Sequence, residues 1–217
     1  MVILTKKSVY SLVLMDDVIK AVDEEAYRQG TSRSNLINQI LAEHLSCTTP
    51  EMRMRNIFNA FSGLMDSCFQ LQPHNSDSLI AVRTALQYRY NPTINYKVEL
   101  QRSPDKYIGT LKVHIRTQSQ NLIELFSGFF RFWTELEIEC LSDRINAEYS
   151  AEICDSRFSR KLFNPKIKEE ELGGRIYRYV NFLDRCIKMY FADKDKFQKQ
   201  AENTKAYYLN EIKNSII

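Results

Sequence analysis

Residues 6–45 read KKSVYSLVLMDDVIKAVDEEAYRQGTSRSNLINQILAEHL, and this stretch decides the fold expected for the first part of the chain. From Val9 to Leu14 the residues can alternate between two faces, which predicts a short strand. Two acidic residues, Asp16 and Asp17, predict the start of a helix, and Gly30 predicts its end. The stretch TSRS at 31–34 then predicts the N-cap of a second helix.

A unit of one strand and two short helices cannot be stable alone. A single strand leaves its backbone groups unpaired, and two short amphipathic helices enclose too small a core. The arrangement that resolves both problems is a two-fold dimer, in which the two strands pair antiparallel as a ribbon and four helices close a shared core. The sequence therefore predicts a β-α-α unit that dimerises.

Three segments in fixed order, LVLMDDVIKAVDEEA, then Gly30, then SRSNLINQIL, resemble the ribbon-helix-helix DNA-binding proteins of the Arc/MetJ/CopG superfamily. The resemblance covers about residues 6–45. It implies that the ribbon enters the DNA major groove, and that the second helix holds a phosphate at its N-terminus. By this resemblance the base-reading residues are Val9, Ser11 and Val13, and the phosphate-binding residues are Lys6, Lys7, Thr31, Ser32, Arg33 and Ser34. The dimer core is Tyr10, Leu12, Leu14, Val18, Val22, Leu36, Ile37, Ile40 and Leu41.

The rest of the chain predicts a separate, larger domain. The expected domains are a ribbon-helix-helix domain at residues 1–48, a helical connector at residues 49–75, and an α+β domain at residues 76–217 that senses an effector or oligomerises. Apolar residues alternate from Ile94 to Leu100 and from Leu111 to Ile115, which predicts an antiparallel hairpin or a three-stranded meander in a mostly helical domain. The run from Asn121 to Leu141 is apolar almost all round, which predicts a central core helix or, alternatively, an aromatic-lined pocket.

Two charge patterns leave alternatives open. A basic excess between residues 76 and 116 predicts either a longer DNA footprint or a solvated sheet face. It comprises Arg83, Arg89, Lys97, Arg102, Lys106, Lys112 and Arg116. The acidic residues Glu135, Glu137 and Glu139 are expected on solvated helix faces.

Composition excludes several classes of protein. The chain has 217 residues, a net charge of +3 and no apolar run of the roughly 18 residues that a membrane span needs. Its start lacks the features of a signal peptide, so a cytoplasmic protein is expected. Five cysteines and three histidines are dispersed, which predicts no metal site and no cofactor. Because no catalytic motif is present, the protein is not expected to be an enzyme.

The sequence therefore predicts a cytoplasmic α+β protein that binds double-stranded DNA as a homodimer or a dimer of dimers. We expect a sequence-specific transcriptional regulator that acts as a repressor, and its C-terminal domain could bind a small-molecule or protein effector. The alternatives are an antitoxin or plasmid-maintenance protein, a DNA accessory factor of a mobile element, and an enzyme in which the ribbon only dimerises the chain. The N-terminal unit could also be a dimerisation module without DNA binding, or an unrelated strand-helix-helix unit.

Overall fold

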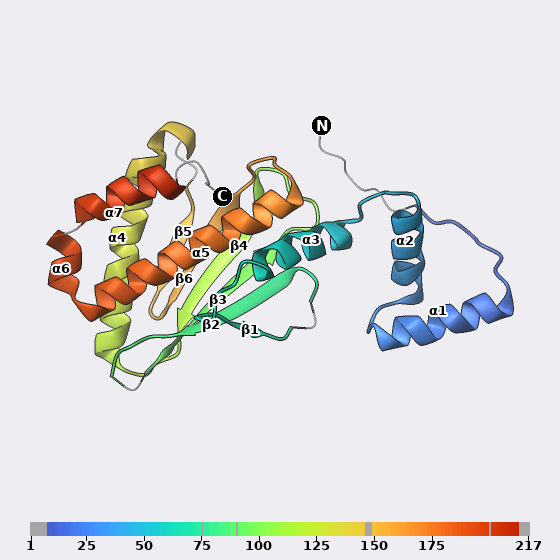
Figure 1. Cartoon of the computed structure of the whole chain (residues 1–217), viewed down its shortest axis with the longest axis horizontal. Helices are drawn as coiled ribbons and strands as arrows, with labels where there is room; N and C mark the ends of the chain where they lie inside the picture. Colours follow the sequence, from blue (N-terminus) through green and yellow to red (C-terminus); the bar gives the residue numbers. More distant parts are fainter. Residues whose placement is uncertain (1–7, 75, 90, 146–148, 200, 213–217) are drawn as a thin grey trace. The chain divides into compact units, whose positions relative to one another are not determined.

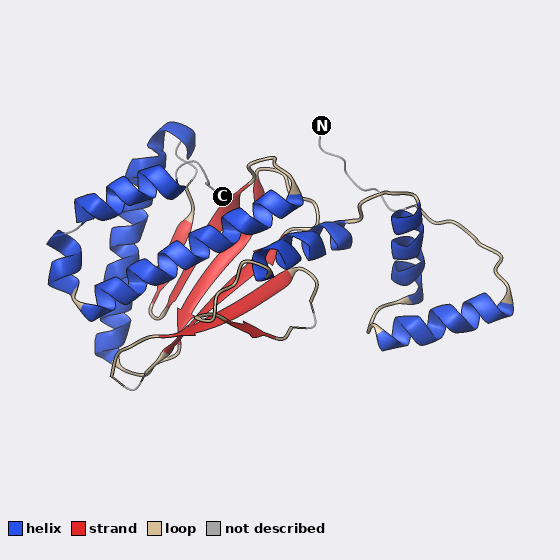
Figure 2. Cartoon of the chain, viewed as in Figure 1, coloured by secondary structure: helices blue, strands red, loops and turns tan. Residues whose placement is uncertain are grey.

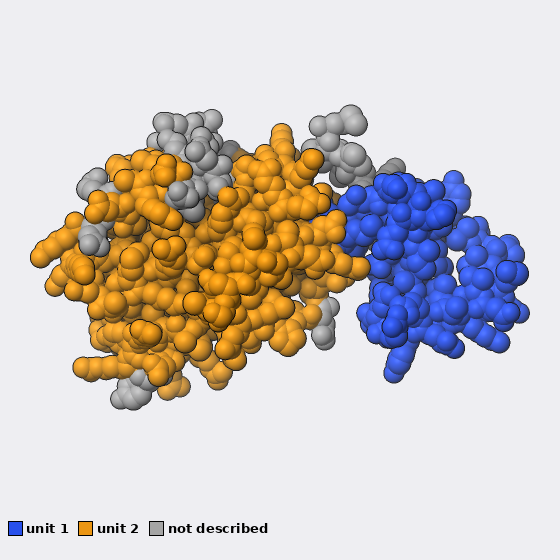
Figure 3. Space-filling view, in the orientation of Figure 1, with its two compact units in different colours: residues 1–53 blue, residues 54–217 orange. Residues whose placement is uncertain are grey.

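A computed structural model describes residues 8–74, 76–89, 91–145, 149–199 and 201–212 (Figure 1). The chain forms two compact units, residues 1–53 and residues 54–217, which are coloured separately in Figure 3. Each unit is described by itself below. The N-terminal unit is helical, and the second unit contains all the strands of the described chain.

The N-terminal unit contains two helices, α1 (Asp16–Arg28) and α2 (Arg33–His44). Both acidic residues predicted to start α1 lie in its first turn, where they favour the positive end of the helix dipole. The turn between the helices contains Gly30 with a φ of 62°, a left-handed conformation that favours glycine. Ser32 caps α2, because its Oγ accepts a hydrogen bond from the backbone N–H of Asn35 at 3.3 Å. The two predicted helices are therefore confirmed.

The predicted strand at the start of this unit is wrong. Residues 8–15 form no strand, and three helices, α1, α2 and α3 (Pro50–Ser62), precede the sheet. A strand requires a partner for its backbone groups, and no strand of the described chain pairs with residues 8–15. The chain therefore does not start with the β-α-α arrangement of a ribbon-helix-helix fold.

The second unit is built on a six-stranded antiparallel sheet with the strand order β1-β2-β3-β4-β6-β5. The strands are β1 (Gln70–Gln72), β2 (Leu79–Ala85), β3 (Thr93–Leu100), β4 (Tyr107–Ile115), β5 (Ala151–Cys154) and β6 (Arg157–Phe163). β3 and β4 pair antiparallel in the predicted hairpin, with Ile94 opposite Ile115. The sheet is larger than the predicted hairpin or three-stranded meander.

Helices cover one face of this sheet, and Figure 2 shows α3 and α5 lying across it. The helices after β4 are α4 (Gln120–Ile145), α5 (Glu169–Ala192), α6 (Lys194–Lys199), α7 (Ala201–Tyr207) and the short π-helix η1 (Tyr208–Ile212). α4 is the predicted central helix: Phe126, Phe130 and Trp133 are fully buried, and the Phe130 ring stacks on Phe158 of β6. The aromatic run therefore fills the core.

The other face of the sheet carries the residues that alternate with the core positions. On β3 and β4, Lys97, Glu99 and Lys112 are exposed, whereas their neighbours Val98 and Leu111 are buried. The same alternation continues on β6, where Arg157 and Lys161 are exposed. We call this surface the basic face. It consists of Arg83, Asn95, Lys97, Glu99, Thr110, Lys112, His114, Glu152, Arg157, Ser159 and Lys161, with Tyr107 and Phe163 at one end.

Candidate functional site

The first turn of α2 holds the predicted phosphate-binding residues together. Ser32, Arg33 and Ser34 are exposed, and Thr31 is half-buried. The first backbone N–H groups of a helix lack intrahelical acceptors, so this turn can donate hydrogen bonds to an anion. The guanidinium of Arg33 lies 2.5 Å from Asp23 of α1 in an exposed ion pair. An exposed pair of this kind contributes little to stability, so the guanidinium can exchange the carboxylate for a phosphate. Lys6 and Lys7 lie outside the described residues.

The predicted dimer core is mostly exposed in the single chain. Within the N-terminal unit the buried apolar cluster consists of Val22, Ala26 and Leu36, with Ile37 packed against it. The exposed fraction is 86% for Tyr10 and 49% for Ile40. Leu12, Leu14, Val18 and Leu41 are exposed as well. The role of these residues in a dimer core stays a prediction.

The predicted base-reading residues lie in the extended segment that precedes α1. Val9, Ser11 and Val13 are all exposed. Because this segment forms no strand, the two alternating faces that were expected for it are not present. Their contact with bases stays a prediction from the resemblance alone.

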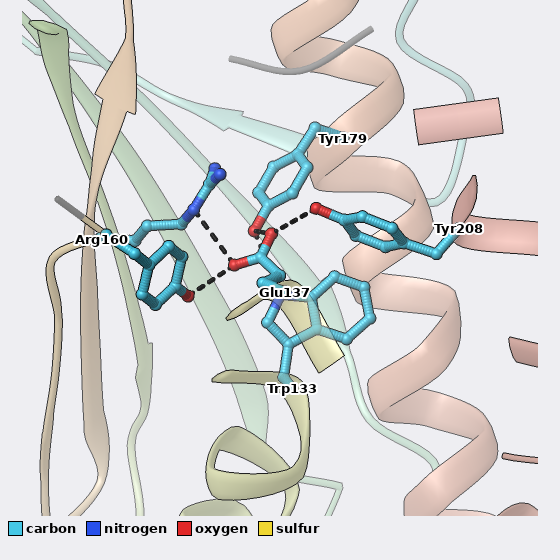
Figure 4. A network of polar contacts seen from close by, with 6 residues as sticks. Trp133, Glu137, Arg160, Tyr179 and Tyr208 are labelled. Atoms are coloured by element: carbon cyan, nitrogen blue, oxygen red, sulfur yellow. Dashed lines mark hydrogen bonds and ion pairs between the residues drawn. The ribbon is translucent and has the colours of Figure 1, made fainter. Parts of the chain in front are cut away.

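A buried polar network connects α4, α5, β6 and η1 in the second unit (Figure 4). The Glu137 carboxylate accepts hydrogen bonds from the hydroxyls of Tyr179 at 2.7 Å, Tyr208 at 2.8 Å and Tyr149 at 2.6 Å. The Nε of Arg160 lies 3.1 Å from the same carboxylate, and both side chains are buried. Trp133 donates to the Tyr179 hydroxyl at 3.1 Å. The expectation that Glu137 is solvated is therefore wrong.

The buried charges of Glu137 and Arg160 stabilise each other, and the phenols around them donate hydrogen bonds to the carboxylate. Burial has the largest single effect on the pKa of Arg160 and lowers it, but Glu137 together with the phenols of Tyr179, Tyr208 and Tyr149 raises it by more, so the net direction is upward. Burial raises the pKa of Tyr179 and Tyr208 well above the ordinary value, with a further contribution from Glu137. The arginine therefore stays charged and the phenols stay protonated as hydrogen-bond donors. Four surface depressions of about 500 to 660 Å³ in the described chain are lined by other residues, and the buried network joins the helices to the sheet.

A second buried carboxylate joins α5 to the sheet. Asp184 accepts hydrogen bonds from the hydroxyls of Thr84 at 2.7 Å and Tyr96 at 2.9 Å. Its other oxygen lies 2.7 Å from the Nζ of Lys188, which is partly exposed. Lys188, Thr84 and Arg83 line a surface depression of about 660 Å³. Because Asp184 already neutralises Lys188, this depression has little free positive charge from that residue.

The basic face holds another accessible cluster of charged side chains. A depression of about 540 Å³ lies on it, lined by side chains that include Lys97, Lys112, His114 and Arg157. The sequence pointed to the lysines of β3 and β4 through the basic excess, but not to Arg157 and Lys161 of β6. Their strand was missed because Arg160 occupies a core position, which interrupts the apolar alternation.

Comparisons with known proteins give no relative. No family model, no curated protein and no solved structure matches this chain. Within the described residues, no group of three or more histidine, cysteine or acidic side chains is placed to hold a metal ion. No described helix has the length and hydropathy needed to cross a membrane.

Proposed function

We propose that this protein binds double-stranded DNA as a homodimer through its N-terminal unit, and that it acts in the cytoplasm as a transcriptional repressor. The observation that carries the DNA contact is the first turn of α2, which presents Ser32, Arg33 and Ser34 to solvent. The sequence resemblance of residues 6–45 to a family of DNA-binding proteins supports the same role. The regulatory part of the proposal depends on that resemblance.

The exposed apolar residues of the unit support the homodimer. A core of four side chains buries too little surface to stabilise two helices, because each buried apolar side chain contributes only about 1.5–3 kcal/mol. The exposed Leu12, Ile40 and Leu41 would add to this core if a second copy covered them. The measurement is sedimentation of the full chain, where twice the 25.5 kDa mass of the chain is expected. A monomer at micromolar concentration would contradict the proposal.

DNA binding is tested by selecting duplexes from a random pool with the full chain, followed by affinity against salt on the selected duplex. Arg33→Ala should weaken binding to every duplex and reduce the slope of log K against log salt by about 1.8, because each of the two copies loses one phosphate contact worth about 0.9. Asp23→Asn should strengthen binding, because it removes the carboxylate that competes for Arg33. Lys20→Ala removes an exposed positive charge from α1 and is the matched control.

Arg33→Ala and Asp23→Asn are expected to change the affinity for DNA in opposite directions, so their comparison is decisive. If Arg33→Ala, Asp23→Asn and Lys20→Ala bind alike, the first turn of α2 does not contact phosphate. Ser11→Ala tests the predicted base contact separately, since it should relax the preference at one base pair without changing the salt slope. If no duplex is enriched, the N-terminal unit serves dimerisation alone.

A further inference from the structure

The basic face brings positive side chains of three strands into two adjacent rows. In one row Asn95, His114 and Arg157 lie opposite one another on β3, β4 and β6. In the next row Lys97 lies directly opposite Lys112, which in turn lies opposite Ser159. Neighbouring strands are roughly 4.8 Å apart, and residues on one face recur about every 7 Å along a strand. The face therefore presents closely spaced positive charges on a broad surface.

Few acidic side chains compensate these charges. Lys112 forms an ion pair with Glu99 at 2.9 Å. Among the described residues, no acidic side chain lies within ion-pair distance of Lys97 or Arg157. Two lysines directly opposite one another destabilise a sheet, so this arrangement is unfavourable for folding by itself.

The positive charges of the basic face change the pKa of His114. Burial lowers its pKa, and the positive charges of Arg157, Lys97 and Arg116 lower it further. Three cations therefore act on one half-buried imidazole at the centre of the face. A bound anion would relieve this repulsion.

Aromatic rings lie at the end of the same face. The rings of Tyr107 and Phe163 are 5.2 Å apart between centroids, and both side chains are half-buried. The Nζ of Lys161 lies 5.0 Å from the Tyr107 centroid, and the Nζ of Lys106 lies 5.6 Å from it. Aromatic rings beside a positive surface are the combination with which proteins bind single-stranded nucleic acids, since the bases stack while the cations hold the phosphates.

We propose that the basic face binds single-stranded nucleic acid, with phosphates held at Lys97 and Arg157 and bases directed to the Tyr107–Phe163 end. This site lies in the second unit and is additional to the duplex contact proposed for α2. The major groove of a duplex fits a helix or a two-stranded ribbon rather than the broad face of a sheet, and stacking on aromatic rings requires bases that are already unpaired. An acidic peptide would use the cations but not the aromatic rings.

The test uses the full chain and fluorescence anisotropy of labelled 20-nucleotide single strands, of both DNA and RNA, over a range of salt concentrations. The variant is Lys97→Gln with Arg157→Gln. The matched control is Lys194→Gln with Lys196→Gln, which removes the same charge from exposed positions on α6. Trp133 fluorescence and circular dichroism verify that each variant is folded.

We expect the Lys97/Arg157 variant to bind at least tenfold more weakly and to lose about 1.4 from the salt slope, the value for two single-strand phosphates. The control should change affinity less than twofold. Equal losses in both variants, or none in either, would overturn the proposal. So would displacement of the single strand by poly-glutamate at equal charge concentration, because the face would then be a general site for acidic chains.

A second measurement does not depend on these variants. The proton resonances of His114 should titrate with a higher pKa when the unlabelled single strand is bound, since the phosphates offset the neighbouring cations. An unchanged titration would place the nucleic acid elsewhere. Arg33→Ala separates this site from the proposed duplex site, because it should weaken duplex binding and leave single-strand binding unchanged.

Discussion

Replacing Glu137 by glutamine should be among the most destabilising single changes in the second unit. The amide has nearly the same shape as the carboxylate but carries no charge. The Arg160 guanidinium, which is buried 3.1 Å away, would then keep its positive charge without a counter-ion. The three phenols would also lose a charged acceptor.

The expected loss follows from these contacts. Removing one partner of a buried ion pair costs about 3–5 kcal/mol, because the remaining charge is desolvated and unpaired. The Arg160 guanidinium lies 4.7 Å from the Tyr179 ring, and this cation–π contact is expected to survive and moderate the loss. For a unit of this size, each kcal/mol lowers the melting temperature by roughly 2–4 °C. A decrease of about 6–20 °C is therefore expected.

The assay is urea unfolding followed by tryptophan fluorescence. Trp133 is the only tryptophan of the chain and lies in the network itself, so the signal reports the second unit. Three variants complete a double-mutant cycle: Glu137→Gln, Arg160→Met, and both together. Tyr149→Phe, which removes one hydrogen bond at the rim of the network, is the control and should cost about 1–3 kcal/mol.

The double variant decides whether the reasoning is correct. Because it removes both charges, it should be less destabilised than the sum of the two single variants by at least 2 kcal/mol. If the losses simply add, the charges do not compensate each other. If Glu137→Gln loses no more than Tyr149→Phe, the carboxylate is not the centre of the network.

Three further predictions concern packing, protonation and thiol reactivity. Gly173→Ala should destabilise the second unit by about 1–3 kcal/mol in the same urea assay, since the new Cβ would lie 2.2 Å from a carbonyl oxygen of α3. Gly174→Ala is the control and should be neutral or stabilising, because the nearest atom to its new Cβ lies 3.4 Å away. The folded pKa of His114 is below its ordinary 6.5, so the unfolded chain binds this proton at higher pH, and stability should fall as pH drops below about 6.5. That pH dependence should weaken in His114→Gln. Burial raises the pKa of Cys186 to about 12, and Cys140 is buried as well. A thiol reagent at pH 8 should therefore label the three exposed cysteines rapidly and these two only after unfolding. Rapid labelling of all five would contradict the burial of Cys140 and Cys186.

The two helices of the N-terminal unit could be predicted because their signals are local. Asp16, Gly30 and Ser32 act on backbone groups within one turn of themselves, so a short window of sequence contains the information. The segment 8–15 is different. Its alternation describes which way side chains would point in a strand, but strand formation depends on a partner that the segment itself does not contain.

In the second unit the hairpin of β3 and β4 was predictable and the strand β6 was not. Ile94, Tyr96 and Val98 are all apolar core positions, so the alternation of β3 is complete. On β6 the middle core position is Arg160, whose burial depends on Glu137 of a distant helix. A pairing between residues 23 positions apart in the sequence cannot be recognised from either residue alone. The same pairing explains why Glu137 was expected in solvent.

The candidate sites show the same limit. The TSRS turn is one continuous stretch, and the structure places its residues together at the start of α2. The basic face combines β3, β4 and β6, so its charges meet only through strand pairing. Composition indicated a basic excess in the middle of the chain, but the contribution of Arg157 depended on knowing that β6 lies beside β4.

Both edge strands of the six-stranded sheet, β1 and β5, are short. β1 has three residues and β5 has four, whereas the four strands between them have seven to nine. A short border offers few unpaired backbone groups to another chain, so growth of the sheet by edge-to-edge stacking of copies is disfavoured. The unit can therefore keep a broad, open surface in solution without polymerising through its borders. Shortening or deleting β5 would expose the longer β6 and should make the protein prone to aggregate, even where its core is unchanged.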